Sequence, residues 1–455
     1  MTVSVLWFRR DLRLSDHPAL LAALDAGTSV LPVFVLDPRL LAPGRPRSRR
    51  LVAAVRALAA ALDGRLVVRT GNPGEVVPEL AREVGAETVH VTRETTPFGR
   101  RRDAAVAAAL SAEGRRLAAT GTPYAAGPGR VVTQSGAAYR VFGPFARAWR
   151  AHGSPPPASP PLRIPWFDGD VGGVALPAVS AVASSGGLAG EVAARQKWLD
   201  FLADGKLARY GEDRDRPDLD ATSRMSIPLK YGEIHPRTLL ADIASHPDGR
   251  TSGAATFVTE LAWREFYADV LWHRPESAWQ DLRPELARIP YDTGPETDRL
   301  VEAWRAGRTG YPIVDAGMRQ LLAEGWMHNR LRMITASFLT KDLHVWWPAG
   351  ARHFLDHLLD GDIASNNHGW QWVAGTGTDA APYFRVLNPL RQAHRFDPEG
   401  EYVRRWVPEL AHLPGAAAHE PWDHPNGYDH GYPGRIVDHD VERREALTRY
   451  ELSRR

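Results

Sequence analysis

Three hydroxyl side chains and one arginine fall within the five residues Thr222-Ser223-Arg224-Met225-Ser226. Hydroxyls and a guanidinium group can together bind the oxygens of a pyrophosphate, especially where a helix begins. A hydroxyl that only caps a helix explains this segment better when the segment is taken alone. Whether this segment binds a pyrophosphate or only caps a helix therefore depends on the motifs found elsewhere in the sequence.

A second segment combines aromatic and charged residues on one predicted helical face. In the run 257–267, helical spacing places Glu260, Trp263, Arg264 and Tyr267 together. Packing in a core would explain the aromatic side chains, but it would not explain the two charges beside them. The face is therefore a candidate binding surface.

Two later blocks carry further polar and aromatic side chains. The first is Met327-His328-Asn329-Arg330-Leu331-Arg332-Met333. The second is Asp360-Gly361-Asp362-Ile363-Ala364-Ser365-Asn366-Asn367-His368-Gly369-Trp370-Gln371-Trp372, and it leads into Gly375-Thr376-Gly377-Thr378-Asp379-Ala380-Ala381-Pro382-Tyr383-Phe384-Arg385. By contrast, His353 and His357 lie four residues apart but have no third ligand in the sequence, so we expect no metal there.

The elements that position these residues can be predicted from apolar patterns. Short β-branched runs at 3–8, 30–36, 66–69 and 88–92 alternate with helical stretches such as 51–62, which predicts a Rossmann-like parallel α/β domain. The first strand is followed by Phe8-Arg9-Arg10-Asp11 and not by GxGxxG. This counts against a nicotinamide-linked oxidoreductase, which an absorption spectrum would test.

Composition changes twice along the rest of the chain. The run 153–165 is rich in proline and the run 181–190 in small residues, and both are typical of a linker. From Glu191 onward, Trp and Leu recur at helical spacing. We predict an α/β domain at 1–130, an interdomain linker at 131–190 and an all-helical domain at 191–455.

The overall composition excludes several classes of protein. The 455 residues contain no cysteine, which excludes disulfides and thiolate chemistry, and no apolar run long enough to span a membrane. The N-terminus does not resemble a signal peptide, so a cytoplasmic protein is expected. The 56 Lys and Arg nearly balance 54 Asp and Glu, but a DNA-binding protein needs only a local basic face.

Together, the blocks resemble the class I cyclobutane pyrimidine dimer photolyases of the photolyase/cryptochrome family. The resemblance begins at Leu6-Trp7-Phe8-Arg9-Arg10-Asp11-Leu12-Arg13 and continues to Arg404-Arg405-Trp406-Val407-Pro408-Glu409-Leu410. It implies an N-terminal α/β domain that binds an antenna chromophore and a C-terminal helical domain that binds FAD and DNA. The implied substrate is damaged DNA containing pyrimidine dimers, and we expect a monomer.

The resemblance also assigns roles to residues around the flavin. Asp360 and Arg332 resemble the ion pair beside the isoalloxazine ring, and Asp362 the residue that bonds its polar edge. Asn366 matches the residue that faces flavin N5; because cryptochromes often have Asp or Cys there, Asn favours repair. The residues implied to bind the FAD phosphates are Tyr210, Thr222, Ser223, Arg224, Met225, Ser226 and Arg264.

On the substrate side, the resemblance implies that a dimer leaves the duplex and enters a pocket, at a cost of a few kcal/mol. Trp263 and Trp372 match the indoles on which the dimer stacks. Glu260 and Asn329 match the residues that hydrogen-bond the thymines, and Met333 packs against the dimer. Arg330 and Arg385 match residues that contact DNA phosphates.

The implied reaction is transfer of one electron from light-excited reduced FAD to the dimer, followed by ring splitting and return of the electron. A chain of aromatic residues supplies electrons to oxidised flavin, and Trp370 and Trp347 match its first two members. The usual third tryptophan is missing: an ungapped alignment places Gly294 there. A short insertion places Tyr291 there, which we favour.

Antenna and function each have an alternative. Lys230 resembles the lysine of relatives that bind 8-hydroxy-5-deazaflavin, and Asp37, Arg47 and Glu94 lie in matching segments, although Glu94 replaces an Asp. Methenyltetrahydrofolate stays open as the antenna.

The main alternative function is a cryptochrome-type blue-light photoreceptor. Repair of (6-4) photoproducts is a further one, but Asn329 with Met333 fits the cyclobutane site better than the histidine pair that (6-4) repair uses.

Overall fold

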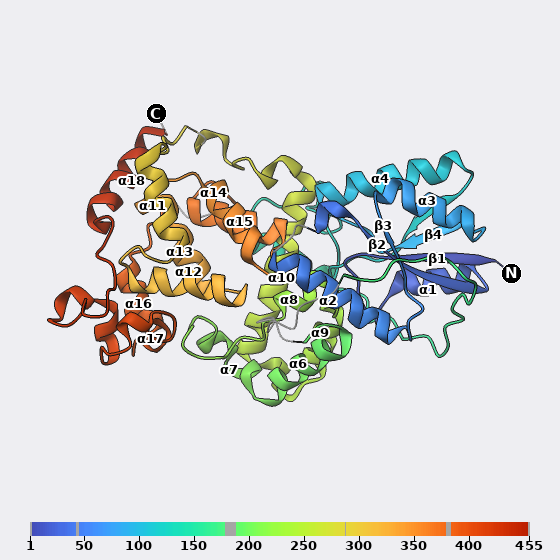
Figure 1. The fold of residues 1–455 in the computed structure, drawn as a ribbon, viewed down its shortest axis with the longest axis horizontal. Helices are drawn as coiled ribbons and strands as arrows, with labels where there is room; N and C mark the ends of the chain where they lie inside the picture. Colours follow the sequence, from blue (N-terminus) through green and yellow to red (C-terminus); the bar gives the residue numbers. More distant parts are fainter. Residues whose placement is uncertain (1, 42–44, 178–187, 287, 379–383, 454–455) are drawn as a thin grey trace. The chain divides into compact units, whose positions relative to one another are not determined.

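The chain packs as two compact units in this computed structural model (Figure 1). The first unit comprises residues 1–139, 143–208 and 223–275, and the second comprises 140–142, 209–222 and 276–455. The structure describes residues 2–41, 45–177, 188–286, 288–378 and 384–453.

The first unit is built on a five-stranded parallel sheet with the order β3-β2-β1-β4-β5. Strand β1 is central because it pairs with both β2 and β4, for example Val5 with Leu31 and with Val89. The central strands are buried, as parallel strands covered by helices must be. The strands are β1 Val3–Phe8, β2 Ser29–Leu36, β3 Val67–Thr70, β4 Thr88–Val91 and β5 Arg116–Ala119.

The sheet confirms the predicted α/β class, and its first four strands match the predicted runs. Strand β5 was not predicted, because Arg-Leu-Ala-Ala contains no β-branched residue and is partly exposed. Residues 153–165 form no helix or strand, whereas α5 Phe142–His152 lies inside the predicted linker 131–190. Of the predicted linker run 181–190, residues 181–187 lie outside the described residues.

Helices α1 to α4 each begin at a proline, whose missing N–H group is not needed in the first turn of a helix. Helices α3 and α4 lie side by side (Figure 1). The helices of this unit are α1 Pro18–Ala26, α2 Pro46–Ala61, α3 Pro73–Glu83, α4 Pro97–Ala112, α5 Phe142–His152, α6 Glu191–Ala203, α8 Ser226–Tyr231, α9 Pro236–Ser245 and α10 Ser252–His273.

The loop after β1 is filled by an ionic network. The Asp11 side chain is buried, accepts hydrogen bonds from Arg9 N (2.7 Å) and from the Thr92 hydroxyl (2.6 Å), and lies 3.2 Å from the His17 ring. Burial alone would raise the pKa of Asp11, but the neighbouring His17 and Arg9 hold it below its ordinary value. This loop therefore lacks the open glycine-rich turn that binds a dinucleotide.

The second unit is helical, and with the first unit it confirms the predicted α/β plus all-α fold class. Its longer elements are α7 Lys206–Asp213, which begins in the first unit, α11 Pro295–Arg305, α12 Pro312–Glu324, α13 Asn329–Ser337, the π-helical turn η5 Phe338–Asp342, α14 Trp347–His357, α15 Ile363–Ala374, α16 Pro389–Phe396, α17 Glu401–Trp406 and α18 His439–Ser453. The short 3₁₀ turns of the chain are η1 Pro38–Leu40, η2 Pro247–Arg250, η3 Pro275–Ala278, η4 Pro284–Leu286, η6 Pro408–Leu410, η7 Gly415–His419 and η8 Pro421–Asp423.

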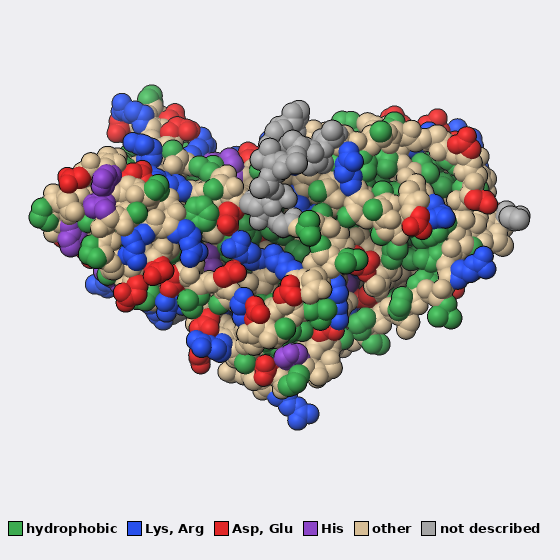
Figure 2. All heavy atoms as spheres, turned by 60° about the horizontal axis from the view of Figure 1, so that its bottom comes forward, with side chains coloured by type: hydrophobic (Ala, Val, Ile, Leu, Met, Phe, Trp, Pro, Cys, Tyr) green, Lys and Arg blue, Asp and Glu red, His purple; other side chains and the backbone are tan. Residues whose placement is uncertain are grey.

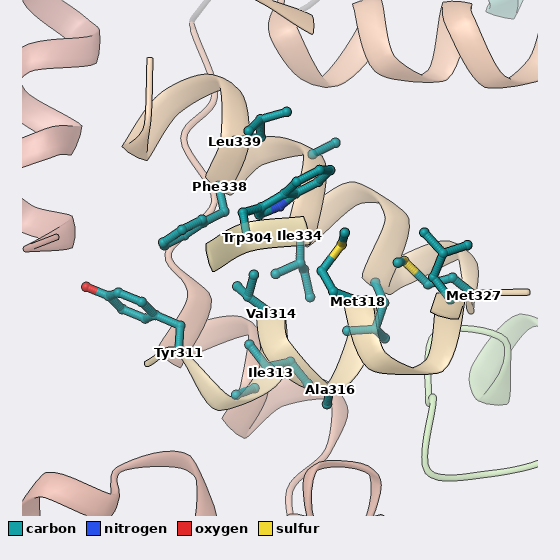
Figure 3. Close-up of a cluster of buried hydrophobic side chains, with 14 of the residues drawn as sticks. Trp304, Tyr311, Ile313, Val314, Ala316, Met318, Met327, Ile334, Phe338 and Leu339 are labelled. Carbon is teal, nitrogen blue, oxygen red and sulfur yellow. The ribbon is translucent and has the colours of Figure 1, made fainter. Parts of the chain in front are cut away.

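The core of the second unit lies between α11, α12, α13 and α14. Trp304, Tyr311, Met318 and Phe338 have no exposed surface, and they pack with aliphatic neighbours (Figure 3). The buried Trp304 indole donates to the Thr335 carbonyl oxygen at 3.0 Å. Its polar atom is therefore satisfied inside the core.

A buried carboxylate ties three segments of this core together. Asp315 on α12 accepts hydrogen bonds from Thr309 N and Oγ1 (both 2.7 Å), Gly310 N (3.1 Å) and the Tyr432 hydroxyl (2.6 Å). Burial raises the pKa of Asp315, and the hydrogen bonds only partly oppose that rise.

We predict that Asp315→Ala lowers the free energy of unfolding of the second unit by about 3 kcal/mol or more, because several buried donors lose their acceptor and each costs about 1–3 kcal/mol. Asp315→Asn keeps an acceptor and should cost less. The pKa of Asp315 is raised in the folded protein. The parent should therefore exceed Asp315→Asn in free energy of unfolding by the largest margin at low pH, and this margin should fall as pH rises through that pKa. Thermal unfolding of the three proteins across pH measures this. Equal midpoints for Ala and parent would contradict it.

Candidate functional site

Helix α10 in the first unit presents the predicted face with Glu260, Trp263 and Arg264, all of them only partly buried. The Trp263 ring packs against Phe266 and Tyr267, with ring centroids 5.8 and 5.3 Å apart. The indole is therefore held by aromatic neighbours while part of its surface stays accessible.

A different face of α10 is anchored by two buried acids. Glu265 accepts backbone hydrogen bonds from Ala125 (3.1 Å), Ala126 (2.9 Å) and Gly127, and Asp269 accepts one from Gly129 (2.7 Å). Burial raises the pKa of Glu265 despite these bonds. The segment 125–129 is thus bound along the helix, and the rotation of α10 about its own axis is set.

Arg264 contacts the residues directly before that segment. Its guanidinium donates to the carbonyl oxygens of Pro123 (3.0 Å) and Leu229 (3.3 Å) and lies 4.4 Å from the centre of the Tyr124 ring. The Leu229 contact links Arg264 to α8, which follows the predicted phosphate-binding segment.

That segment, 222–226, leads into α8, whose first residue is Ser226. The Ser223 hydroxyl accepts a hydrogen bond from Met225 N at 3.3 Å, and Arg224 has the left-handed backbone angle φ +50° that a residue with a side chain seldom adopts. No side chain caps the start of α8. The hydroxyls therefore do not act as the ordinary helix cap that was the alternative for this segment. Tyr210 of the predicted phosphate site lies on α7 in the second unit, with the Arg214 guanidinium 5.8 Å from its ring.

The four predicted antenna residues all lie in the first unit. Asp37 is paired with Arg39 at 2.6 Å, and the buried Glu94 lies 3.8 Å from Arg10 and 3.9 Å from Arg102. Burial would raise the pKa of both acids, but the neighbouring arginines hold it below its ordinary value.

Arg10 connects two of these antenna residues. Besides facing Glu94, its Nε donates to the Lys230 carbonyl oxygen at 3.4 Å, and the neighbouring Tyr231 hydroxyl donates to the Arg47 carbonyl oxygen at 3.4 Å. The structure therefore brings Glu94, Lys230 and Arg47 into one region around Arg10.

Helix α13 in the second unit carries three predicted substrate-side residues near its start. Asn329 is exposed, and its amide lies 4.0 Å from the Met333 sulfur one turn later. Arg330 pairs with Asp215 at 2.5 Å, and its guanidinium lies 4.3 Å from the centre of the Phe396 ring. Asn329 and Met333 thus share an accessible edge of the helix.

Arg332, also on α13, forms an ion pair with Asp360. Arg332 donates to Asp360 Oδ2 at 2.9 Å and to the Met327 carbonyl oxygen at 2.8 Å. The other carboxylate oxygen, Asp360 Oδ1, is buried and has no hydrogen-bond partner among the described residues. A buried acceptor without a donor is costly, so a bound polar group is expected there.

Helix α15 begins at Asp362, whose carboxylate accepts from Ala364 N (3.0 Å) and Ser365 N (3.2 Å). One turn on, the Asn366 amide donates to the Ala351 carbonyl oxygen (3.1 Å) and to Asn367 Oδ1 (2.9 Å). With both amide hydrogens used in this way, the carbonyl oxygen of Asn366 is the atom that can accept a further hydrogen bond.

The C-terminal half of α15 carries two tryptophans in different surroundings. Trp370 is buried against Phe354 and Trp304, with centroid distances of 4.9 and 6.1 Å. Trp372 is only partly buried, and the guanidinium of the exposed Arg385 lies 5.2 Å from its ring. An accessible indole beside a cation can bind a base by stacking and its phosphate by charge.

The predicted electron-transfer residues beyond Trp370 surround one carboxylate. Trp347, at the start of α14, is fully buried, and its indole donates to Asp281 Oδ1 at 2.7 Å. Burial and the charge of Asp281 raise the pKa of Tyr291. Trp346 is 40% exposed, with its ring centroid 6.4 Å from that of Trp347.

Several of these partners were not predicted from the sequence. They are Arg10, Asp215, Glu265, Asp269, Asp281 and Trp346. The neighbouring pair Trp346-Trp347 was a visible signal in the sequence. The acids gave no such signal, because their roles depend on contacts between distant segments.

The described residues hold neither a metal-binding cluster nor a helix that could span a membrane. His353 and His357 have ring centroids 4.4 Å apart, but the described residues contain no cluster of three or more groups that could hold a metal ion. Among the same residues, no helix combines the length and apolar character needed to cross a bilayer.

The chain matches two protein-family models. The model described as DNA photolyase matches residues 4–162, and the model described as the FAD binding domain of DNA photolyase matches residues 257–452. A deoxyribodipyrimidine photo-lyase of Streptomyces griseus is 43% identical, over 100% of this chain and 99% of its own length.

Solved structures of related proteins agree with this match. A class III photolyase from Agrobacterium tumefaciens has a TM-score of 0.92 and 37% identity, over 100% of this chain and 98% of its own. A cryptochrome from Synechocystis has a TM-score of 0.89 and 28% identity, over 98% of this chain and 99% of its own. The chain belongs to the DNA photolyase family, and its FAD-binding domain makes FAD its cofactor.

Proposed function

We propose that this chain is a deoxyribodipyrimidine photo-lyase that splits cyclobutane pyrimidine dimers in DNA with light. Full-length similarity to proteins of that name supports the activity. The structural observation that carries the proposal is the accessible Trp372 indole with Arg385 beside it, near the end of the helix that also carries Asn366. Such a surface suits an extruded base with its phosphate.

The residues of the second unit have the donor and acceptor groups that a flavin requires. Asp360 Oδ1 and the Asn366 carbonyl oxygen can accept from the N–H groups of the ring, while Arg332 holds Asp360 in place. The proposed phosphate ligands are Tyr210, Thr222, Ser223, Arg224, Met225, Ser226 and Arg264, with Asp362 at the flavin's polar edge. When bound and reduced, FAD supplies the light-excited electron.

Aromatic, polar and arginine side chains of the protein bind the dimer and the DNA phosphates. Trp263 and Trp372 stack on the dimer, each contributing about 1–3 kcal/mol per base. Glu260 and Asn329 hydrogen-bond its thymines, and Met333 packs against it. Arg330 and Arg385 contact phosphates and so position the DNA without selecting a sequence.

We assign the electron supply to Trp370, Trp347 and Tyr291, in that order. The order is supported by burial: Trp370 and Trp347 are enclosed, while Tyr291 is less buried and has Asp281 nearby. A phenol loses its proton when it is oxidised, and the Asp281 carboxylate is a suitable acceptor.

The first unit is proposed to hold a second chromophore near Asp37, Arg47, Glu94 and Lys230. We favour 8-hydroxy-5-deazaflavin over methenyltetrahydrofolate, on the resemblance around Lys230. The proposed organisation has an antenna domain at 1–130, a linker at 131–190 and an FAD- and DNA-binding domain at 191–455. We further propose a cytoplasmic monomer.

The alternative function is that of a cryptochrome-type photoreceptor, and the similarity to the Synechocystis cryptochrome is the observation that favours it. An assay on purified protein separates the two. Photoreduced enzyme, illuminated with DNA carrying cyclobutane dimers, should restore the intact pyrimidines. Light-dependent changes of the flavin spectrum without any loss of dimers would favour the photoreceptor.

We predict that Glu260→Ala lowers the number of dimers repaired per absorbed photon, because the dimer loses a hydrogen bond from a charged group. Such bonds contribute about 1.5–3 kcal/mol, so the preference for dimer DNA over intact DNA should fall about tenfold or more. FAD content should stay normal. Glu87→Ala, which removes an exposed carboxylate before β4, is the matched control. Loss of FAD with unchanged repair per bound flavin would show that Glu260 is structural.

We predict that Asn366→Asp changes the absorption spectrum of the flavin during photoreduction, because a group that can donate a proton then faces N5. Asn388→Asp makes the same change at the cap of α16, where either residue accepts from Arg391 N, and should leave the spectrum unaltered. Superimposable spectra for parent and Asn366→Asp, at equal FAD content, would show that residue 366 does not face the flavin.

We predict that Tyr291→Phe slows photoreduction of oxidised FAD and leaves repair by pre-reduced enzyme intact. The phenylalanine ring is too difficult to oxidise to pass the charge on. Transient absorption should detect a tyrosyl radical in the parent, with a rate that depends on pH because the phenol must release a proton. Identical photoreduction in both proteins would mean that electrons enter by another residue.

A further inference from the structure

Lys341 is a buried lysine without a role in the proposed mechanism. It lies in η5, the π-helical turn that follows α13, and its side chain is 2% exposed. Burial lowers the pKa of Lys341 well below its usual value, although the neighbouring Asp342 opposes the effect. Lysine is almost never fully buried unless it is paired, and single π-turns are frequent at functional sites.

The amino group of Lys341 closes the end of α15. It donates to the carbonyl oxygen of Ala374, the last residue of that helix, at 2.6 Å. The last carbonyl groups of a helix have no partner within it and carry partial negative charge, which a cation stabilises. Lys341 therefore holds the end of the helix on which Trp372 lies.

The same amino group holds Phe384. It lies 3.0 Å from the centre of the Phe384 ring, and the Tyr450 ring of α18 is stacked on Phe384 with centroids 4.3 Å apart and an interplanar angle of 12°. An ammonium group and a stacked ring this close cannot occupy the same face. Phe384 is therefore enclosed between Lys341 and Tyr450.

Phe384 directly precedes Arg385, the residue whose guanidinium lies over the Trp372 ring. One buried amino group thus contacts both chain segments that meet at the surface: the end of α15, which carries Trp372, and the residue before Arg385. The separation of this indole and this cation depends on how those segments are joined.

The turn that carries Lys341 is itself fixed by α18. His439 pairs with Asp342 at 2.5 Å, and Glu442 pairs with His344 at 2.8 Å. Burial raises the pKa of Asp342 to about 6, and His439 opposes that rise. With Asp342 and His344 bound in this way, Lys341 has little freedom to follow its partners if they move.

We propose that Lys341 is a positioning residue for DNA binding, which sets Arg385 over Trp372 by joining the end of α15 to Phe384. The proposal rests on the DNA-binding role proposed above for Arg385. A buried charge is expensive to keep, and an apolar residue of similar size often preserves stability. A lysine that serves this purpose should therefore be replaceable for folding but not for DNA affinity.

The test is a double-mutant cycle with Lys341→Met and Arg385→Ala, measured as affinity for dimer DNA. Lys341→Met alone should weaken binding about fivefold, within the range of couplings between neighbouring residues. In the Arg385→Ala background it should have almost no further effect. Lys341→Arg should recover part of the affinity, because it restores a cation. Lys206→Met, which removes a lysine paired with Asp204 at 3.0 Å, is the matched control.

FAD content and the unfolding midpoint should be measured for every variant. If Lys341→Met does not fold, Phe384→Leu removes the ring contact while keeping the lysine, and it should give the same loss of affinity and the same dependence on Arg385. Equal losses in both backgrounds, or no loss at all, would overturn the proposal. Unchanged affinity in Arg385→Ala would instead show that the DNA role of Arg385 is wrong.

Discussion

Polar groups buried along α15 must all be hydrogen-bonded, and this requirement sets the direction in which the helix presents its functional side chains. Gln371 has no exposed surface; its amide donates to the Ser277 carbonyl oxygen (2.7 Å) and accepts from Leu282 N (2.9 Å). Asn367, one turn earlier, donates to the Ala278 carbonyl oxygen. Rotating the helix would leave these groups unpaired at about 1–3 kcal/mol each. The faces that carry Asn366 and Trp370 are fixed as a result.

Helix α10 of the first unit is also held in its orientation by buried polar side chains, which here are acids and not amides. Glu265 and Asp269 are one turn apart and bind backbone N–H groups of residues 125–129, on a different face from Trp263. Because Glu265 is buried and its pKa is raised, its carboxylate depends on those donors for its charge. In both units, the residues proposed to act on substrate therefore lie on helices whose orientation is set by buried polar contacts elsewhere.

The distribution of charge on the visible surface does not by itself indicate where DNA would bind. Figure 2 shows Lys and Arg side chains mixed with Asp and Glu on the visible face, in keeping with a formal net charge of +2. Several arginines already have acidic partners, as Arg330 has Asp215. The DNA interface proposed above therefore rests on local arrangements such as Arg385 over Trp372 and not on an overall positive potential.

Local patterns in the sequence were sufficient for the first four strands of the sheet and for the start of α6. Glu191, where the helical pattern was predicted to begin, is the first residue of α6. The sequence could not show that α6 and α8–α10 pack within the first unit, because that depends on contacts between distant segments. Nor could it show that Arg224 adopts a left-handed backbone, which surrounding structure has to impose on a residue with a side chain.

Some residues of the candidate site could likewise be predicted from the sequence, and others could not. The motif-bearing residues could be assigned by resemblance, whereas Asp281 and Lys341 could not, since each acts on residues far away in the sequence. Asp281 illustrates the difference: it follows an unremarkable 3₁₀ turn, yet it binds the Trp347 indole and raises the pKa of Tyr291.

The position of Asp281 bears on how charge can leave the interior. A carboxylate 2.7 Å from the Trp347 indole nitrogen stabilises a positive charge on that ring by Coulomb attraction, in surroundings that screen it weakly. An oxidised indole can keep its proton for a time, but an oxidised phenol cannot, so passage to Tyr291 requires proton release while passage to the exposed Trp346 does not. If Tyr291 is the terminal donor, as proposed above, its step should therefore depend on pH, and the charge of Asp281, which raises the pKa of Tyr291, bears directly on that step.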